Sequence, residues 1–114
     1  IYSATIGNSS NPASMSFYQS DTYRFFFLLS FMHEHFKGSE ISQEFAISLV
    51  PKKYASRIKR LQVLKSSVQL GYINEESSLT DKRRRIYTPS DSMINDFFNM
   101  TESVSKIQDS KKAS

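Results

Sequence analysis

The sequence of 114 residues contains no cysteine and no tryptophan, and only three glycines and three prolines. Without cysteine the chain can form neither a disulfide nor a thiolate metal site. Three glycines are too few for a glycine-rich loop that cradles phosphates. The longest apolar run, Phe25 to Met32, is far shorter than the roughly 20 residues of a membrane-spanning helix. We therefore expect a protein of the cytoplasm that does not enter a membrane.

The sequence also lacks the residue patterns of enzymes and metalloproteins. No nucleophile is accompanied by a base and an orienting group, and no pair of carboxylates lies in an apolar setting. His33 and His35 flank Glu34, but side chains two residues apart on a helix point to different sides, which disfavours a shared metal ion. We expect no enzymatic activity, no cofactor and no metal.

Positive charge is present and is concentrated in one part of the chain. Residues 52–85 contain ten of the 15 Lys and Arg but three of the 11 Asp and Glu, which gives this segment a net charge of +7, while the rest carries −3. A basic patch on a small domain is the expected footprint of binding to a phosphate backbone, although charge runs are often only solvated loops.

The first part of the chain predicts an arm followed by an aromatic helix. Residues 1–16 are rich in Ser, Asn, Ala and Pro and are predicted to be a flexible arm. Residues 17–36 have helical spacing, with Ser20 or Asp21 able to cap and Gly38 ending the helix. Its apolar surface is wider than one stripe, so we expect a homodimer, rather than a purely intramolecular core, to cover it. The predicted dimer-interface residues are Phe25, Phe26, Phe27, Leu29, Phe31, Phe97 and Phe98.

The middle of the chain, residues 42–70, predicts a helix-turn-helix. Ser42 can cap a first helix, and Pro51 marks a boundary. The next helix combines an apolar stripe with many Lys and Arg, and it begins either near Pro51 or near Ser56.

Residues 71–88 predict a short β-hairpin, because turn formers and three consecutive arginines are followed by a strand-forming Ile-Tyr-Thr sequence. A last helix is predicted over residues 90–107 and a disordered tail over residues 109–114. The predicted fold is mainly α with a small β-hairpin wing, a winged helix-turn-helix over residues 17–108 that dimerises through its N- and C-terminal helices.

Two motifs make this chain similar to the MarR-type winged-helix regulators. Asp81, Arg83, Arg85 and Ile86, with the Pro-Ser pair at 89–90, match an Asp-x-Arg-x-Arg-hydrophobic-x-x-Pro-Thr/Ser wing found in part of that family. Gly-Tyr-Ile at 71–73 stands where those proteins carry Gly-Leu-Ile before the wing.

The resemblance implies a homodimer on double-stranded DNA that regulates transcription from a pseudo-palindromic operator, with a recognition helix in the major groove. Arg83 would be the wing arginine that approaches the minor groove, and Asp81 would hold the wing by pairing with an arginine. The residues expected to contact DNA are Lys52, Lys53, Tyr54, Ser56, Arg57, Lys59, Arg60, Lys82, Arg83, Arg84 and Arg85. A DNA regulator of this type is expected at the nucleoid.

The sequence departs from the family in the helix-turn-helix, where about five extra residues lie between Ala46 and Gly71, and this leaves open whether the recognition helix begins near Pro51 or near Ser56.

Two other functions stay open: a winged helix within a replication, partition or other nucleoprotein assembly, and a module that binds an acidic protein or RNA. The Phe- and Met-rich crevice between the dimer helices and the winged domain could hold an unidentified apolar effector, although such residues are more often core.

Overall fold

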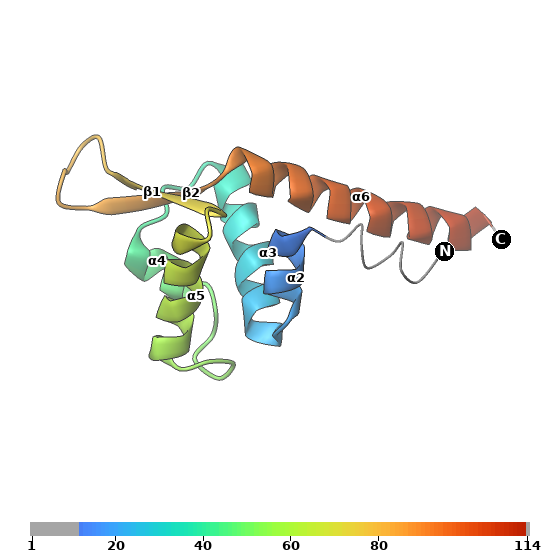
Figure 1. Ribbon diagram of the computed structural model, residues 1–114, viewed down its shortest axis with the longest axis horizontal. Helices are drawn as coiled ribbons and strands as arrows, with labels where there is room; N and C mark the ends of the chain where they lie inside the picture. The colour runs from blue at the N-terminus through green and yellow to red at the C-terminus, as the bar shows by residue number, and fades with distance from the viewer. Residues whose placement is uncertain (1–11, 114) are drawn as a thin grey trace.

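The structure is a computed structural model that describes the backbone of residues 12–113 and the side chains of residues 12–103. The elements are α2 (Ala13–Gln19), α3 (Thr22–Lys37), α4 (Gln43–Ser48), α5 (Arg57–Gln69), β1 (Ile73–Ser77), β2 (Arg85–Pro89) and α6 (Asp91–Ala113). Helices α2 to α5 form a central body, from which the hairpin projects in one direction and α6 in the other (Figure 1). The predicted fold class, mainly α with one β-hairpin wing, is confirmed.

The predicted helix over residues 17–36 is two helices, because Asp21 has extended backbone angles and separates α2 from α3. Helix α2 also begins at Ala13, within the segment predicted as a flexible arm. Packing explains this difference: Met15 is buried, and the Ser14 hydroxyl donates a 2.8 Å hydrogen bond to Asp96 of α6. The rest of the predicted arm, residues 1–11, lies outside the described residues.

Aromatic side chains from α2 and α3 form the centre of the core. Phe27 and Phe31 stack with ring centroids 5.5 Å apart, and Tyr18 stacks on Phe27 at 6.4 Å. The buried Tyr18 hydroxyl donates a 2.7 Å hydrogen bond to Ser67 of α5, which in turn donates to the Val63 carbonyl. This chain of hydrogen bonds ties α2 to α5 through the core.

Burial raises the pKa of Tyr18 well above its ordinary value, although the Ser67 hydroxyl acts in the opposite direction. The unfolded chain releases this proton near pH 10, whereas the folded chain retains it. The contribution to the free energy of unfolding is therefore complete below about pH 10 and falls as the pH rises further. We expect Tyr18→Phe to lower that free energy by about 1 kcal/mol at neutral pH and to make its alkaline decline shallower.

Urea unfolding from neutral to alkaline pH measures both effects. Tyr54→Phe, at an exposed tyrosine, is the matched control for losing a hydroxyl at neutral pH. An equally steep alkaline decline in Tyr18→Phe would show that other groups cause it.

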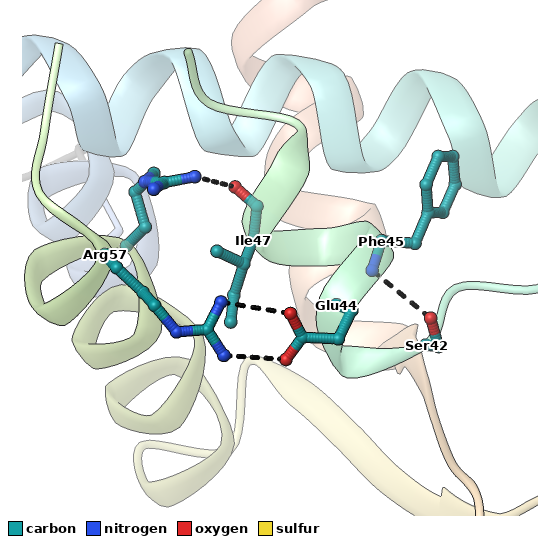
Figure 2. A network of polar contacts seen from close by, with 6 residues as sticks. Ser42, Glu44, Phe45, Ile47 and Arg57 are labelled. Atoms are coloured by element: carbon teal, nitrogen blue, oxygen red, sulfur yellow. Dashed lines mark hydrogen bonds and ion pairs between the residues drawn. The ribbon is translucent and has the colours of Figure 1, made fainter. Parts of the chain in front are cut away.

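The helix-turn-helix consists of α4, a linker over residues 49–56, and α5. The Ser42 hydroxyl caps α4 by accepting from the Phe45 amide (Figure 2). The Ser56 hydroxyl caps α5 by accepting from the Lys59 amide at 3.2 Å. Of the two starts predicted for the second helix of the motif, the one near Ser56 is observed, and residues 49–56 form the linker before it.

The hairpin follows α5 directly. Gly71 has a φ of 84°, a left-handed conformation that side chains disfavour, and so ends the helix. Strands β1 and β2 pair antiparallel from Ile73 opposite Pro89 to Ser77 opposite Arg85. The Tyr87 amide donates to the Ile41 carbonyl at 2.9 Å, which attaches β2 to the segment before α4.

Helix α6 begins as predicted, with the Ser90 hydroxyl accepting from the Met93 amide at 3.2 Å. It continues to Ala113, through most of the segment predicted as a disordered tail; Ser114 lies outside the described residues. No proline or glycine follows Pro89, so the sequence contains no strong helix breaker there. Among the described residues, no helix is both long and apolar enough to cross a membrane.

Candidate nucleic-acid interface

The linker between α4 and α5 presents an exposed turn with two lysines. The Tyr54 amide donates to the Pro51 carbonyl at 3.0 Å, which closes the turn and exposes Lys52 and Lys53. The Tyr54 ring packs on Phe26 of α3 with centroids 5.6 Å apart. Tyr54 therefore anchors the turn to the body while the lysines face solvent.

The first turn of α5 carries further exposed cations. Arg57 and Lys59 are exposed, and the Lys59 ammonium lies 6.0 Å from the centroid of the Tyr23 ring. Ser56 is exposed as well, but its hydroxyl already serves as the helix cap. Arg57 and Lys59 therefore present charged donors at this turn, and the Ser56 hydroxyl, which accepts the cap bond through its oxygen, keeps its own O–H donor.

Arg57 forms a two-pronged ion pair with Glu44 of α4 (Figure 2). Its Nη1 and Nη2 donate to the two carboxylate oxygens at 3.0 and 2.8 Å. Hydrogen bonding to Arg57 lowers the pKa of Glu44, and the same bonds raise the pKa of Arg57. Both groups therefore remain charged at neutral pH, and the pair links the two helices of the motif.

Arg60 does not lie where the sequence analysis placed it. Its exposed fraction is 8%, and Nη1 donates to the carbonyls of Ile47 and Val50 at 3.1 and 3.4 Å. The Ile47 carbonyl lies in the last turn of α4, where a cation is favoured by the helix dipole, and the Val50 carbonyl lies just beyond the helix. Arg60 fixes α4 against α5 and is turned away from solvent, so its predicted contact with DNA is corrected.

The tip of the hairpin carries the wing cations. Lys82, Arg83, Arg84 and Arg85 are all exposed, and the Arg83 side chain has an exposed fraction of 95%. The Asp81 carboxylate accepts from the Arg83 amide at 3.0 Å and lies 3.8 Å from Arg83 Nε. Asp81 thus shapes the turn that presents these cations.

Arg84 has a partner outside the hairpin, because its Nη1 lies 3.3 Å from the Glu40 carboxylate. This ion pair connects the wing to the segment that precedes α4.

Two hollows connect the wing to the helix-turn-helix. The first has a volume of about 610 Å³ and is lined by Glu44, Ile47, Ser48, Lys52, Ala55, Ser56, Arg57 and Arg60. The second has a volume of about 490 Å³ and is lined by Ser42, Gln43, Glu44, Arg83, Arg84 and Arg85. Because Glu44 lines both, the two hollows adjoin. The exposed cations of α5, the linker and the wing, together with these hollows, are called here the basic face.

The predicted dimer-interface residues have different environments. Phe27 and Phe31 are buried inside the single chain. Phe25 and Phe97 are partly buried against the same core, whereas Phe26, Leu29 and Phe98 are exposed. Phe36, which is not among the predicted interface residues, is also exposed, and its ring centroid lies 5.3 Å from that of Phe98.

The apolar hollow beside these residues lies between α3 and α6. It has a volume of about 470 Å³ and is lined by Leu29, Met32, His33, Phe36, Lys37 and Phe97. Within the described residues, no group of three or more His, Cys, Asp or Glu side chains could hold a metal ion.

Glu44 is the site residue that the sequence analysis did not identify. Its partner Arg57 lies well along the chain, across the linker, and no local spacing rule pairs residues so far apart. The sequence offered a weaker indication of its importance: Glu44, in the first turn of α4, is an acidic residue in a motif whose other charged residues are basic.

Comparisons with known proteins give one distant likeness. No family model matches the sequence, and no curated protein matches it. A solved structure described as the crystal structure of apo (heme-free) PefR is 16% identical, with a TM-score of 0.41, and the alignment covers 92% of this chain and 95% of that chain. This likeness is too remote to support an argument, so the winged-helix assignment rests on the elements described above.

Proposed function

We propose that this chain is a double-stranded DNA-binding transcriptional regulator of MarR-like architecture, which acts as a homodimer on a pseudo-palindromic operator. The observation that carries the proposal is the basic face, which combines the exposed cations of α5, the linker and the wing with two adjoining hollows. A helix and a hairpin that present cations side by side match the two grooves of a duplex and the phosphates between them.

The basic face assigns different contacts to its parts. Lys52 and Lys53 on the linker suit phosphates, because an ammonium on a flexible stem binds as a point charge. Arg57 at the start of α5 would contact base edges in the major groove, because a guanidinium can bind guanine through two hydrogen bonds. Arg83, which is nearly fully exposed, suits a narrow minor groove.

The exposed apolar side chains of α3 and α6 support the homodimer. Leu29, Phe36 and Phe98 are exposed in the single chain, and Phe36 and Phe98 are in contact. Covering such a cluster removes apolar surface from water, which favours association. The same surface favours the second candidate, a winged helix that docks on another protein in a nucleoprotein assembly.

The hollow between α3 and α6 is the place we assign to the apolar effector predicted from the sequence. Its lining is mainly apolar and also includes the polar side chains of His33 and Lys37. A small apolar molecule there would lie between α6 and the body that carries the basic face.

Selection of bound sequences from random duplex DNA, with light scattering of the complex, tests the proposed function. We expect enrichment of an inverted repeat bound by two copies of the chain. Tight binding by a single copy without enrichment would support the nucleoprotein assembly instead. Absence of any duplex binding at low salt would reject both and leave a module for an acidic protein or RNA.

A further inference from the structure

An acidic side chain lies in the middle of the basic face. Each of the two hollows is lined by Glu44 and, among the described residues, by no other acidic side chain. A carboxylate at this place repels the phosphates that the surrounding cations attract. We infer that Glu44 determines sequence discrimination, because it withholds Arg57 from phosphates and releases it where a base pair satisfies both side chains. This inference rests on the proposed function and adds to it.

The geometry of the pair shows how Arg57 is withheld. Glu44 occupies Nη1 and Nη2 of Arg57 together, at 3.0 and 2.8 Å. This end-on pair of donors is one of the two forks with which a guanidinium makes a two-pronged hydrogen bond to a phosphate or to a guanine edge. While the pair is intact, this fork of Arg57 is occupied, and the pair has no net charge to attract a phosphate.

Glu44 and Arg57 are exposed to solvent, so a ligand can displace either partner of the ion pair. The side chains of Arg57 and Glu44 have exposed fractions of 57% and 66%, so water surrounds both and a ligand can compete for either. A phosphate replaces the carboxylate as a partner for Arg57 but offers Glu44 no donor. The edge of a base pair offers acceptors on guanine to Arg57 and the amino group of cytosine to Glu44.

Glu44 therefore affects binding to an arbitrary sequence and binding to the preferred site differently. On an arbitrary sequence, breaking the pair exposes the carboxylate to neighbouring phosphates, so Arg57 adds little to the affinity. On a sequence with a guanine–cytosine pair under α5, both side chains regain partners. Glu44 thus weakens binding to arbitrary DNA more than binding to the preferred site.

A purely structural role would give the opposite result. If the pair served only to join α4 to α5, its loss would loosen the motif and weaken binding to every sequence equally. The structure provides another connection between these helices, because Arg60 donates to the Ile47 carbonyl independently of Glu44. We therefore expect Glu44→Gln to fold normally, which thermal unfolding checks.

The test compares Glu44→Gln with the unaltered chain on two duplexes, the selected site and a short duplex of mixed sequence. We expect Glu44→Gln to bind the mixed duplex roughly threefold to tenfold more tightly at about 50 mM salt, with its salt slope steeper by about 0.9, the increment of one added cation. Binding to the selected site should change less, so the ratio of the two affinities falls.

Two further variants sharpen the interpretation. Asp21→Asn removes one charge from the ion pair of Asp21 with Arg24, which joins neighbouring turns at the start of α3, and should leave the affinity ratio unchanged. Arg57→Gln leaves Glu44 without its cation partner, so in the unaltered chain it should weaken binding to mixed DNA by repulsion between the carboxylate and the phosphates. When Glu44 is already Gln, the same substitution should instead lower the salt slope by about 0.9.

The outcomes distinguish failure of the proposed function from failure of the proposed role of Glu44. Absence of duplex binding by the unaltered chain overturns both the proposed function and the role of Glu44. If the unaltered chain binds DNA and Glu44→Gln leaves the affinity ratio unchanged, or weakens both duplexes equally, only the role of Glu44 is overturned.

Discussion

Simultaneous substitution of Arg83 and Arg85 by Gln is expected to weaken binding to every duplex by about tenfold to a hundredfold at roughly 100 mM salt, and to reduce the salt slope by about 1.8. Each exposed arginine displaces counterions when it meets a phosphate, and the double substitution removes two such charges from the wing tip. Fluorescence anisotropy of a labelled duplex at several salt concentrations gives both quantities.

Lys37→Gln is the control for this experiment. Lys37 is an exposed cation at the end of α3, where it lies 3.9 Å from Glu34 and outside both hollows of the basic face. Its substitution should leave the salt slope unaltered. A double wing variant that keeps the full slope would show that the hairpin does not contact DNA, even if the rest of the basic face does.

Phe31→Ala is expected to lower the free energy of unfolding by about 3–5 kcal/mol, which is a large part of the stability of a small domain. Phe31 has no exposed surface and stacks on Phe27, so its removal leaves a cavity that the surrounding helices cannot fill. Urea unfolding measures the loss.

Phe36→Ala is the matched control, because it is the same substitution on the same helix at a half-exposed position. We expect its effect on the stability of the single chain to be much smaller. Its effect on self-association should be the larger of the two, and light scattering at several protein concentrations measures this. Equal losses of stability would contradict the placement of Phe31 in the core.

The wing was the part of the fold most accessible to prediction from the sequence. Its signals are local: Gly71 stops a helix, turn formers fill the tip, and Ile86 and Tyr87 suit a strand. The position of the predicted hairpin after a basic helix then led to the prediction of a winged-helix fold. Backbone preferences within short segments were sufficient for this conclusion.

Arg57 and Arg60 show where prediction from the sequence fails. Both are cations in the first turn of α5, and no local sequence pattern distinguishes them. Arg57 is exposed, whereas Arg60 is buried against the carbonyl end of α4. Only the packing of α4 on α5 separates the two, and packing depends on contacts between segments distant in the chain.

The aromatic helix shows the same limit. A continuous helical pattern predicted one element, but the chain turns at Asp21 so that α2 can fold back beside α3. Phe27 and Phe31 then find partners inside the chain, including Tyr18 of α2. A helix that is apolar on several sides must bury those sides against other protein surfaces. The sequence alone could not determine how much of this burial occurs within one chain.

The base of the hairpin has a mechanical consequence for the whole molecule. The Ser90 amide donates to the Tyr72 carbonyl at 2.9 Å, and α6 begins at the next residue, Asp91, without any linker. The wing and α6 therefore extend in opposite directions from one shared base (Figure 1). Because no linker separates them, a tilt of α6, which is about 34 Å long at 1.5 Å per residue, would be transmitted to the base of the hairpin and not absorbed by a loop.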